Sequence, residues 1–166
     1  ASQLNIFGYS MGGYVALNLA LQNPELVGKI VTLGTKFDWT VESSAREVKM
    51  LNPMVIEDQV PQFAFKLQAD HEPLDWKEVM TKTADMMLEL GKKPALQTKD
   101  FAQINHEIVI GIGSLDRMVS KEESENAANL LPNGTLKSLE DFPHPIDKIN
   151  PVNLCSYIQE SFALSN

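Results

Sequence analysis

A serine stands between two glycines at G-x-S-x-G spacing in the sequence GYSMG, residues 8–12. A short apolar segment, residues 4–7, precedes the motif, and an apolar segment of helical character, residues 11–22, follows it. Between a strand and a helix, this motif predicts a strained tight turn that presents the serine hydroxyl at the end of the strand. Small residues let strand and helix approach, and four are predicted to supply the space: Gly8, Gly12, Gly13 and Ala16. Ser10 is therefore the candidate nucleophile.

A serine hydroxyl is a poor nucleophile at neutral pH, so it needs a base, and the base needs a carboxylate to orient it. Three histidines follow Ser10 in the chain. His144 lies just past the last predicted strand, where a loop can bring it to the carboxyl edge of a sheet, and we expect it to be the base. We expect surface or packing roles for His106, at the start of a strand, and for His71, at the end of a helical stretch.

The candidate acid is Asp116, which follows the strand predicted at residues 107–112. That position places its carboxylate at the same edge of the sheet as the serine and the histidine. The alternative is a turn or cap residue ahead of the helix that begins at Ser120. Asp141 and Asp147 are rivals, but they crowd the histidine in sequence, and we expect them to shape its loop.

The turn that carries the serine also aims the backbone N–H of Met11 at the N-terminus of the following helix. Negative charge that develops on a carbonyl oxygen is stabilised at such a position, so Met11 is a candidate oxyanion-hole donor. No histidine–carboxylate cluster has the spacing of metal ligands, so neither a metal nor an organic cofactor is expected.

Strands and helices alternate along most of the chain. Strands are predicted at residues 4–7, 28–33, 107–112 and 136–139, and helices at residues 11–22, 120–131 and from Asn150 onward. The first helix is apolar nearly all round, which predicts a buried helix. Ser120 and Glu123 stand at capping-box spacing at the start of the second helix. The alternation predicts an α/β fold with a parallel sheet of about four strands, flanked by helices and joined by right-handed crossovers.

Residues 38–105 contain no clear strand and have helical patterns. We expect these patterns to be broken at Pro53, Pro61, Pro73 and Gly91. The best-marked helix runs over residues 75–90, with Asp75 as its predicted cap. The predicted organisation is therefore a core formed by residues 1–37 and 106–166, with a helical insertion at residues 38–105.

Composition narrows the class of protein. The 43% of hydrophobic residues can form a core, and the net charge of -8 leaves no basic excess to neutralise phosphates, so no nucleic-acid or anionic-membrane partner is expected. No run of about 18 apolar residues predicts a membrane span. The one cysteine, Cys155, excludes a disulfide framework within the chain. We expect a cytoplasmic protein.

The string GYSMGGYVAL at residues 8–17, the string GIGSLDRMV at residues 111–119 and a histidine after the last strand together resemble the α/β-hydrolase superfamily. Within it, the sequence is similar to small bacterial serine hydrolases of the esterase type, over essentially the whole chain. The resemblance implies that Ser10 is the nucleophile of an elbow, His144 the base, Asp116 its orienting acid and Met11 one oxyanion donor. It also implies that residues 38–105 are a cap domain over the active site.

The sequence departs from the family pattern in two places. Pro143 precedes His144 where the family commonly has a glycine. The family also places several strands and helices, and the loop with the second oxyanion donor, ahead of the elbow strand. Nothing in the sequence corresponds to these N-terminal strands, so we expect them to be absent, in a fragment, in a natural truncation or in a chain that completes its sheet by association. An apolar edge strand then predicts a homo-oligomer formed through residues 3–7.

The leading functional hypothesis is a serine hydrolase, foremost a carboxylic ester hydrolase, that cleaves an ester, thioester or related carbonyl substrate through an acyl-serine intermediate. Perhydrolysis of the haloperoxidase kind and carbon–carbon bond hydrolysis use the same three residues. The alternative from another class is a truncated, non-catalytic binding protein with the α/β-hydrolase fold. A partly apolar small-molecule substrate is expected from apolar residues of the insertion, which can also simply pack together: Trp39, Phe63, Phe65, Trp76, Met86 and Met87.

Overall fold

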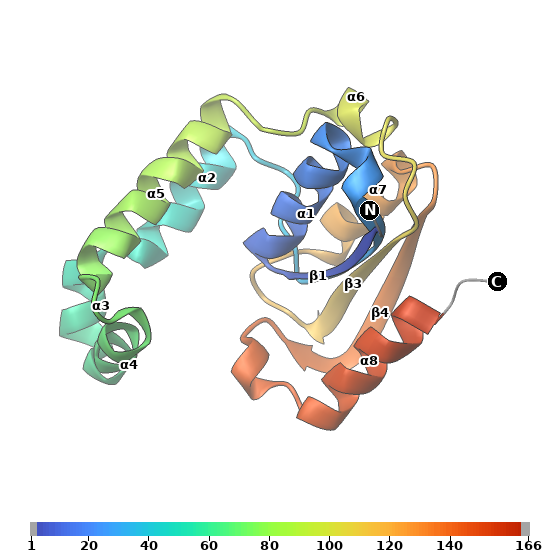
Figure 1. Ribbon diagram of the computed structural model, residues 1–166. Helices are drawn as coiled ribbons and strands as arrows, with labels where there is room; N and C mark the ends of the chain where they lie inside the picture. Colours follow the sequence, from blue (N-terminus) through green and yellow to red (C-terminus); the bar gives the residue numbers. More distant parts are fainter. Residues whose placement is uncertain (1–2, 164–166) are drawn as a thin grey trace. The chain divides into compact units, whose positions relative to one another are not determined.

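The computed structural model describes residues 3–163, which divide into two compact units. The first unit contains the residues up to Phe37 and those from Leu96 onward, and the second contains Asp38–Ala95. The first is built on a sheet and the second on helices (Figure 1). Residues 96–105 belong to the first unit, so the helical unit is shorter than the predicted insertion.

Residues 96–105 are attached to the first unit by specific contacts. The backbone N–H of Leu96 donates to the hydroxyl of Tyr14 at 2.9 Å. The ring of Phe101 packs edge-on against Phe37, with ring centroids 6.2 Å apart. Ile104 is fully buried. Periodicity could not show this attachment, because it depends on partners that are distant in sequence.

A parallel sheet of four strands, in the order β1-β2-β3-β4, forms the centre of the first unit as described. Its strands are β1 Leu4–Tyr9, β2 Val27–Leu33, β3 Ile108–Leu115 and β4 Gly134–Pro143. The predicted parallel sheet is therefore confirmed. β3 and β4 extend beyond the predicted strands because their pairing continues to Leu115 and Pro143, where the residues of β3 are exposed and the apolar pattern has ended.

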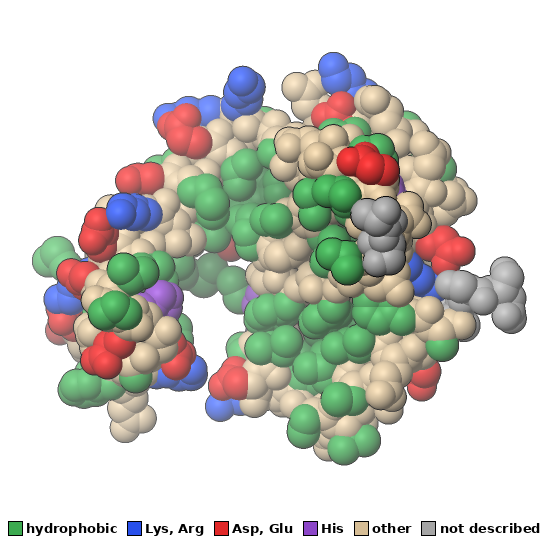
Figure 2. Space-filling view, in the orientation of Figure 1, with side chains coloured by type: hydrophobic (Ala, Val, Ile, Leu, Met, Phe, Trp, Pro, Cys, Tyr) green, Lys and Arg blue, Asp and Glu red, His purple; other side chains and the backbone are tan. Residues whose placement is uncertain are grey.

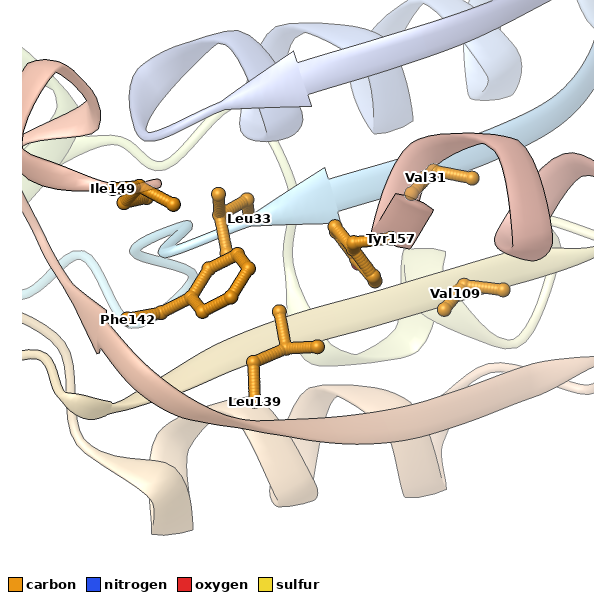
Figure 3. Packing of buried hydrophobic residues seen from close by; sticks show 7 residues of the cluster. All are labelled: Val31, Leu33, Val109, Leu139, Phe142, Ile149 and Tyr157. Atoms are coloured by element: carbon orange, nitrogen blue, oxygen red, sulfur yellow. The ribbon is translucent and has the colours of Figure 1, made fainter. Parts of the chain in front are cut away.

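Helices cover both faces of this sheet. α1 (Met11–Gln22) connects β1 to β2 and α7 (Lys121–Leu130) connects β3 to β4, while α8 (Pro151–Ala163) follows β4 and the short α6 (Thr98–Phe101) precedes β3. Because parallel strands are joined by right-handed connections as a rule, α1 and α7 are expected on one face. Tyr157 of α8 packs on the other face (Figure 3), in a buried cluster made of Val31, Leu33, Val109, Leu139, Phe142, Ile149 and Tyr157.

Only one side of α1 is buried. Its buried residues are Gly13, Tyr14, Ala16, Leu17 and Ala20. Val15 is 58% exposed and Leu19 is exposed as well, four residues further along the same side of the helix. The prediction of a helix buried all round is therefore wrong for this side, because α1 lies against one face of the sheet and its opposite side points away from it.

Two of the glycines around Ser10 are required by close approach of strand and helix. A Cβ on Gly8 would lie 2.6 Å from the backbone of Gly13, and a Cβ on Gly13 would collide with the hydroxyl of Thr35. A Cβ on Gly12 would meet nothing within 4 Å. The expectation that Gly12 supplies packing space is therefore wrong, since a side chain at this position would extend into open space.

The second unit consists of α2 Val41–Glu47, α3 Pro53–Gln59, α4 Pro61–His71 and α5 Trp76–Lys92. Pro53 and Pro61 begin helices, at the first helical position where a missing N–H costs least. Gly91 does not break α5. It lies in the last turn of that helix, where a Cβ would collide with the side chain of Ser44, so it allows α5 to approach α2 closely.

The helices of the second unit enclose a small core of Ile56, Ala64, Leu67 and Trp76, with Met80 packed against it. Other apolar side chains of this unit are exposed, including Phe63 at 48%, Phe65 at 74% and Met86 at 44%. Figure 2 shows hydrophobic side chains among charged ones on the visible face of this unit. Trp76 therefore has a packing role, whereas the exposed apolar residues are available for other contacts.

None of the helices formed by residues 3–163 combines the length and the apolar character that crossing a membrane requires. β1 is at one edge of the described sheet, and Leu4 is 66% exposed there. The association of chains through residues 3–7 stays a prediction.

We expect Gly13→Ala to lower the free energy of unfolding by about 1–3 kcal/mol, because the added methyl group overpacks the contact with Thr35. Gly12→Ala is the matched control in the same turn of α1. It is expected to raise the free energy of unfolding by up to about 1 kcal/mol, since alanine favours a helix more than glycine does. Urea denaturation followed by circular dichroism measures both, and equal effects of the two substitutions would contradict the close approach of α1 to the sheet.

Candidate active site

Ser10 lies in the turn between β1 and α1 with a backbone φ of 51° and ψ of -123°. Few residues other than glycine adopt a positive φ, so the turn is strained as predicted. A serine before a helix usually caps it with its hydroxyl, but Ser10 makes no such bond. Its Oγ lies instead 3.2 Å from Nε2 of His144. The strained backbone thus aims the hydroxyl at an imidazole rather than at the helix.

His144 directly follows β4, and its imidazole connects two other side chains. Nδ1 lies 2.8 Å from Oδ2 of Asp116, while Nε2 faces Ser10. The side chains of His144 and Asp116 are 9% and 2% exposed. If Nδ1 carries the proton and donates it to Asp116, Nε2 is free to accept the proton of the Ser10 hydroxyl. The structure therefore brings together all three side chains that the sequence singled out.

Asp116 directly follows β3 and uses its two carboxylate oxygens differently. Oδ1 accepts hydrogen bonds from the N–H groups of Met118 at 2.8 Å and Val119 at 3.0 Å, and Oδ2 faces His144. The turn function considered as an alternative is therefore present together with the contact to the imidazole. Burial by itself raises the pKa of Asp116, but the hydrogen bonds from His144, Val119 and Met118 outweigh it and hold this pKa below its usual value.

Gly34 lies directly beside the His144–Asp116 pair. It follows β2, has a φ of 57°, and its N–H donates to the carbonyl of Gly111 at 3.0 Å. A Cβ at this position would lie 2.9 Å from Oδ2 of Asp116 and 3.2 Å from Nδ1 of His144. Sequence reasoning missed Gly34, although a glycine directly after a strand was a signal for a left-handed turn.

Met11 is the first residue of α1, next to Ser10. The first N–H groups of a helix have no partner within the helix, so the N–H of Met11 is not used by the helix itself. The helix therefore begins where it was predicted to begin, and the oxyanion-donor role of Met11 stays a prediction.

The rival residues make other contacts. The backbone N–H of Asp141, a residue with a φ of 60°, donates to Oγ of Ser114 at 3.0 Å, and Asp147 lies 3.7 Å from Nζ of Lys148. His106 contacts the carbonyl of Pro24 through Nε2 at 3.0 Å. In the second unit, the imidazole of His71, at the end of α4, contacts the carbonyl of Leu67 at 2.8 Å.

Sequence reasoning also missed Tyr9, whose hydroxyl donates to the carbonyl of His144 at 2.8 Å. Tyr9 occupies a variable position of the G-x-S-x-G motif, so the motif gave no signal for this contact. Within residues 3–163, no group of three or more His, Cys, Asp or Glu side chains is arranged to hold a metal ion. The arrangement of Ser10, His144 and Asp116 can transfer a proton from a hydroxyl to an imidazole beside a buried carboxylate.

A family model described as the alpha/beta hydrolase fold matches residues 1–83, half of the chain, and the chain belongs to this family. No curated protein sequence matches the chain significantly.

Solved structures show the same fold. NosK from Streptomyces actuosus is similar with a TM-score of 0.71 and 18% identity, over 98% of this chain and 70% of its own. A serine hydrolase involved in carbazole degradation has a TM-score of 0.65 and 18% identity, over 99% and 65%. A thermophilic esterase from Thermogutta terrifontis has a TM-score of 0.63 and 20% identity, over 97% and 65%. The chain thus spans about two thirds of the length of these proteins.

Asp116 predicts a specific response of stability to acid. Because its pKa is lower in the folded state than the reference value of 3.8, its ionised form stabilises the fold above pH 3.8, and this contribution is lost as the pH falls through the folded-state pKa. We expect Asp116→Asn to be less stable than the wild type at pH 6. The difference between their free energies of unfolding should narrow as the pH is lowered below 3.8. Urea denaturation at a series of pH values measures this difference. A gap that stays constant from pH 6 to pH 3 would contradict the stabilised carboxylate.

Proposed function

We propose that this chain carries the catalytic triad of a serine hydrolase, foremost a carboxylic ester hydrolase, that works through an acyl-serine intermediate. The observation that carries the proposal is the continuous chain from the Ser10 hydroxyl through the His144 imidazole to the Asp116 carboxylate, with separations of 3.2 Å and 2.8 Å. Membership of the alpha/beta hydrolase family supports the hydrolase class. The strained turn at Ser10 supports its assignment as a nucleophile elbow.

Acylation follows from this geometry. Oγ of Ser10 bonds to the carbonyl carbon of the ester while Nε2 of His144 accepts the hydroxyl proton. The carbonyl oxygen becomes an oxyanion, and the N–H of Met11 donates to it. The bond from carbon to the alcohol oxygen then breaks, and the alcohol leaves with the proton from His144. Asp116 stabilises the transient imidazolium and keeps the ring oriented.

Deacylation reverses these roles with water. His144 takes a proton from a water molecule, whose oxygen bonds to the acyl carbon of the acyl-serine. The bond from that carbon to Oγ of Ser10 breaks, Oγ recovers the proton from His144, and the carboxylic acid is released. Each step returns the imidazole to its starting state, so the three side chains complete a cycle without a cofactor.

We further propose that the second unit is a cap domain and that the substrate is partly apolar. The helical composition of Asp38–Ala95 and the exposed side chains of Phe63, Phe65 and Met86 support this proposal. Apolar side chains of this kind line the sites that bind acyl or alkyl groups. We also propose a cytoplasmic location, which agrees with the free and exposed thiol of Cys155.

A fluorophosphonate probe tests the nucleophile directly. We expect the wild type to be labelled at Ser10, as located by mass spectrometry, and Ser10→Ala to remain unlabelled. His144→Ala should label about 10²- to 10⁴-fold more slowly, because the general base is lost. His106→Ala is the matched control, since that imidazole contacts Pro24, and it should label like the wild type. A folded wild type that takes no label would overturn the hydrolase and favour the non-catalytic binding protein.

A series of p-nitrophenyl esters tests the substrate class. We expect kcat/KM to rise from acetate to octanoate, because each buried methylene contributes about 0.8 kcal/mol to binding. Ser10→Ala gives the background rate for each ester. A kcat/KM value that falls steadily with chain length would argue against the apolar acyl group and leave the triad unaffected.

A further inference from the structure

The nucleophile and the base follow the two outermost strands of the described sheet. Ser10 follows β1 and His144 follows β4, with β2 and β3 between them. Neighbouring strands lie about 4.8 Å apart, so β1 and β4 are separated by roughly 14 Å in a regular sheet. Yet Ser10 Oγ and His144 Nε2 are only 3.2 Å apart. The last residues of β4, where the pairing with β3 shifts in register, must therefore bend toward β1, and the end of the strand must be held there.

The backbone around His144 has few donors with which to hold itself. Pairing of β4 with β3 ends at Leu115 and Pro143, after a shift in register. Pro143 and Pro145 flank His144, and neither has an N–H that could donate a hydrogen bond. The contacts of the imidazole with Asp116 and Ser10 and the hydrogen bond to the carbonyl oxygen of His144 therefore gain importance in holding this residue.

Tyr9 supplies the contact to that carbonyl. Its hydroxyl donates to the His144 oxygen at 2.8 Å, and its ring lies 5.5 Å from the imidazole, tilted by 42°. The Tyr9 ring and Ile146, two residues past His144, pack against the same buried cluster on the α8 face of the sheet. One side chain thus contacts both the backbone and the ring of the candidate base.

The environment of Tyr9 keeps its hydroxyl protonated. Burial raises its pKa above the usual value, a backbone hydrogen bond with Ile146 lowers it, and the charges of Asp116 and Asp147 raise it again, with a net increase. A phenol with a raised pKa is a donor throughout the neutral range. The proton that Tyr9 donates to the His144 carbonyl is therefore present at neutral pH.

We propose that Tyr9 is a positioning residue, which sets the separation of nucleophile and base by joining the end of β1 to the backbone of His144. Because Tyr9 is adjacent to Ser10 in the chain, the same strand end carries the hydroxyl and the anchor of the imidazole. This inference rests on the proposed function. It adds to it a residue that does not touch the reacting atoms and acts only through His144.

Tyr9→Phe removes the hydroxyl and keeps the ring. We expect its second-order rate of labelling by the fluorophosphonate to fall about 2- to 10-fold, which corresponds to the loss of one neutral hydrogen bond. With an ester substrate, kcat should fall by a similar factor while KM stays unchanged. The Nδ1–H proton of His144, assigned in proton NMR spectra by its absence from His144→Ala, should shift or exchange faster with water.

Tyr157→Phe is the matched control. Tyr157 also donates its hydroxyl to a backbone carbonyl, that of Thr32 at 2.6 Å, and its ring belongs to the same buried cluster. Both substitutions are therefore expected to lower the thermal midpoint. Only Tyr9→Phe should change the labelling rate and the His144 proton, both measured at a temperature where each variant is fully folded.

Two results overturn the inference. One is a Tyr9→Phe variant that labels within 2-fold of the wild type and has an unchanged His144 proton, and the other is an equal slowing of labelling by both substitutions. If the wild type takes no label at all, the proposed function fails, and the His144 proton then decides the positioning role alone. A change of that proton in Tyr9→Phe and not in Tyr157→Phe supports it, and an unchanged proton rejects it.

Discussion

The parallel direction of the four strands is the constraint on which the candidate site depends. Because β1, β3 and β4 run the same way, the residues that directly follow them all lie at the carboxyl ends of the strands. Those residues are Ser10, Asp116 and His144. Helices return the chain to the amino ends of the strands each time. Three residues distant in sequence can therefore meet at the carboxyl ends. An antiparallel strand at any of these positions would place its side chain at the far edge.

Convergence at one edge is not sufficient, because the three side chains must also point at one another. Ser10 points correctly only in a strained turn, which Gly8 and Gly13 permit by letting β1 and α1 approach closely. Gly34 leaves room for the pair formed by His144 and the carboxylate. The same small residues that allow dense packing thus determine the aim of the reactive groups. A substitution that disturbs the packing at these glycines would therefore also change the geometry of the site.

Some polar side chains that are well placed for local hydrogen bonds contact residues distant in sequence. Glu123 has the spacing of a capping box with Ser120, and Ser120 does accept a bond from the Glu123 N–H at 3.1 Å. The Glu123 carboxylate, however, accepts from the N–H of Phe37 at 2.7 Å and so ties α7 to the end of the segment after β2. Asp116 serves its own turn and the imidazole at once. Local and tertiary contacts therefore use the carboxylate oxygens of the same side chains.

The sequence by itself determined the α/β class, the parallel sheet, the helical nature of the second unit and the three side chains of the site, because periodicity and strand ends are local properties. It did not determine that Gly12 is free of contacts, that one side of α1 is exposed, or that Gly34 and Tyr9 adjoin His144. Only the tertiary structure decided these points. Each depends on which atoms meet across the sheet, and contacts between strand ends remote in the chain leave no periodic trace in the sequence.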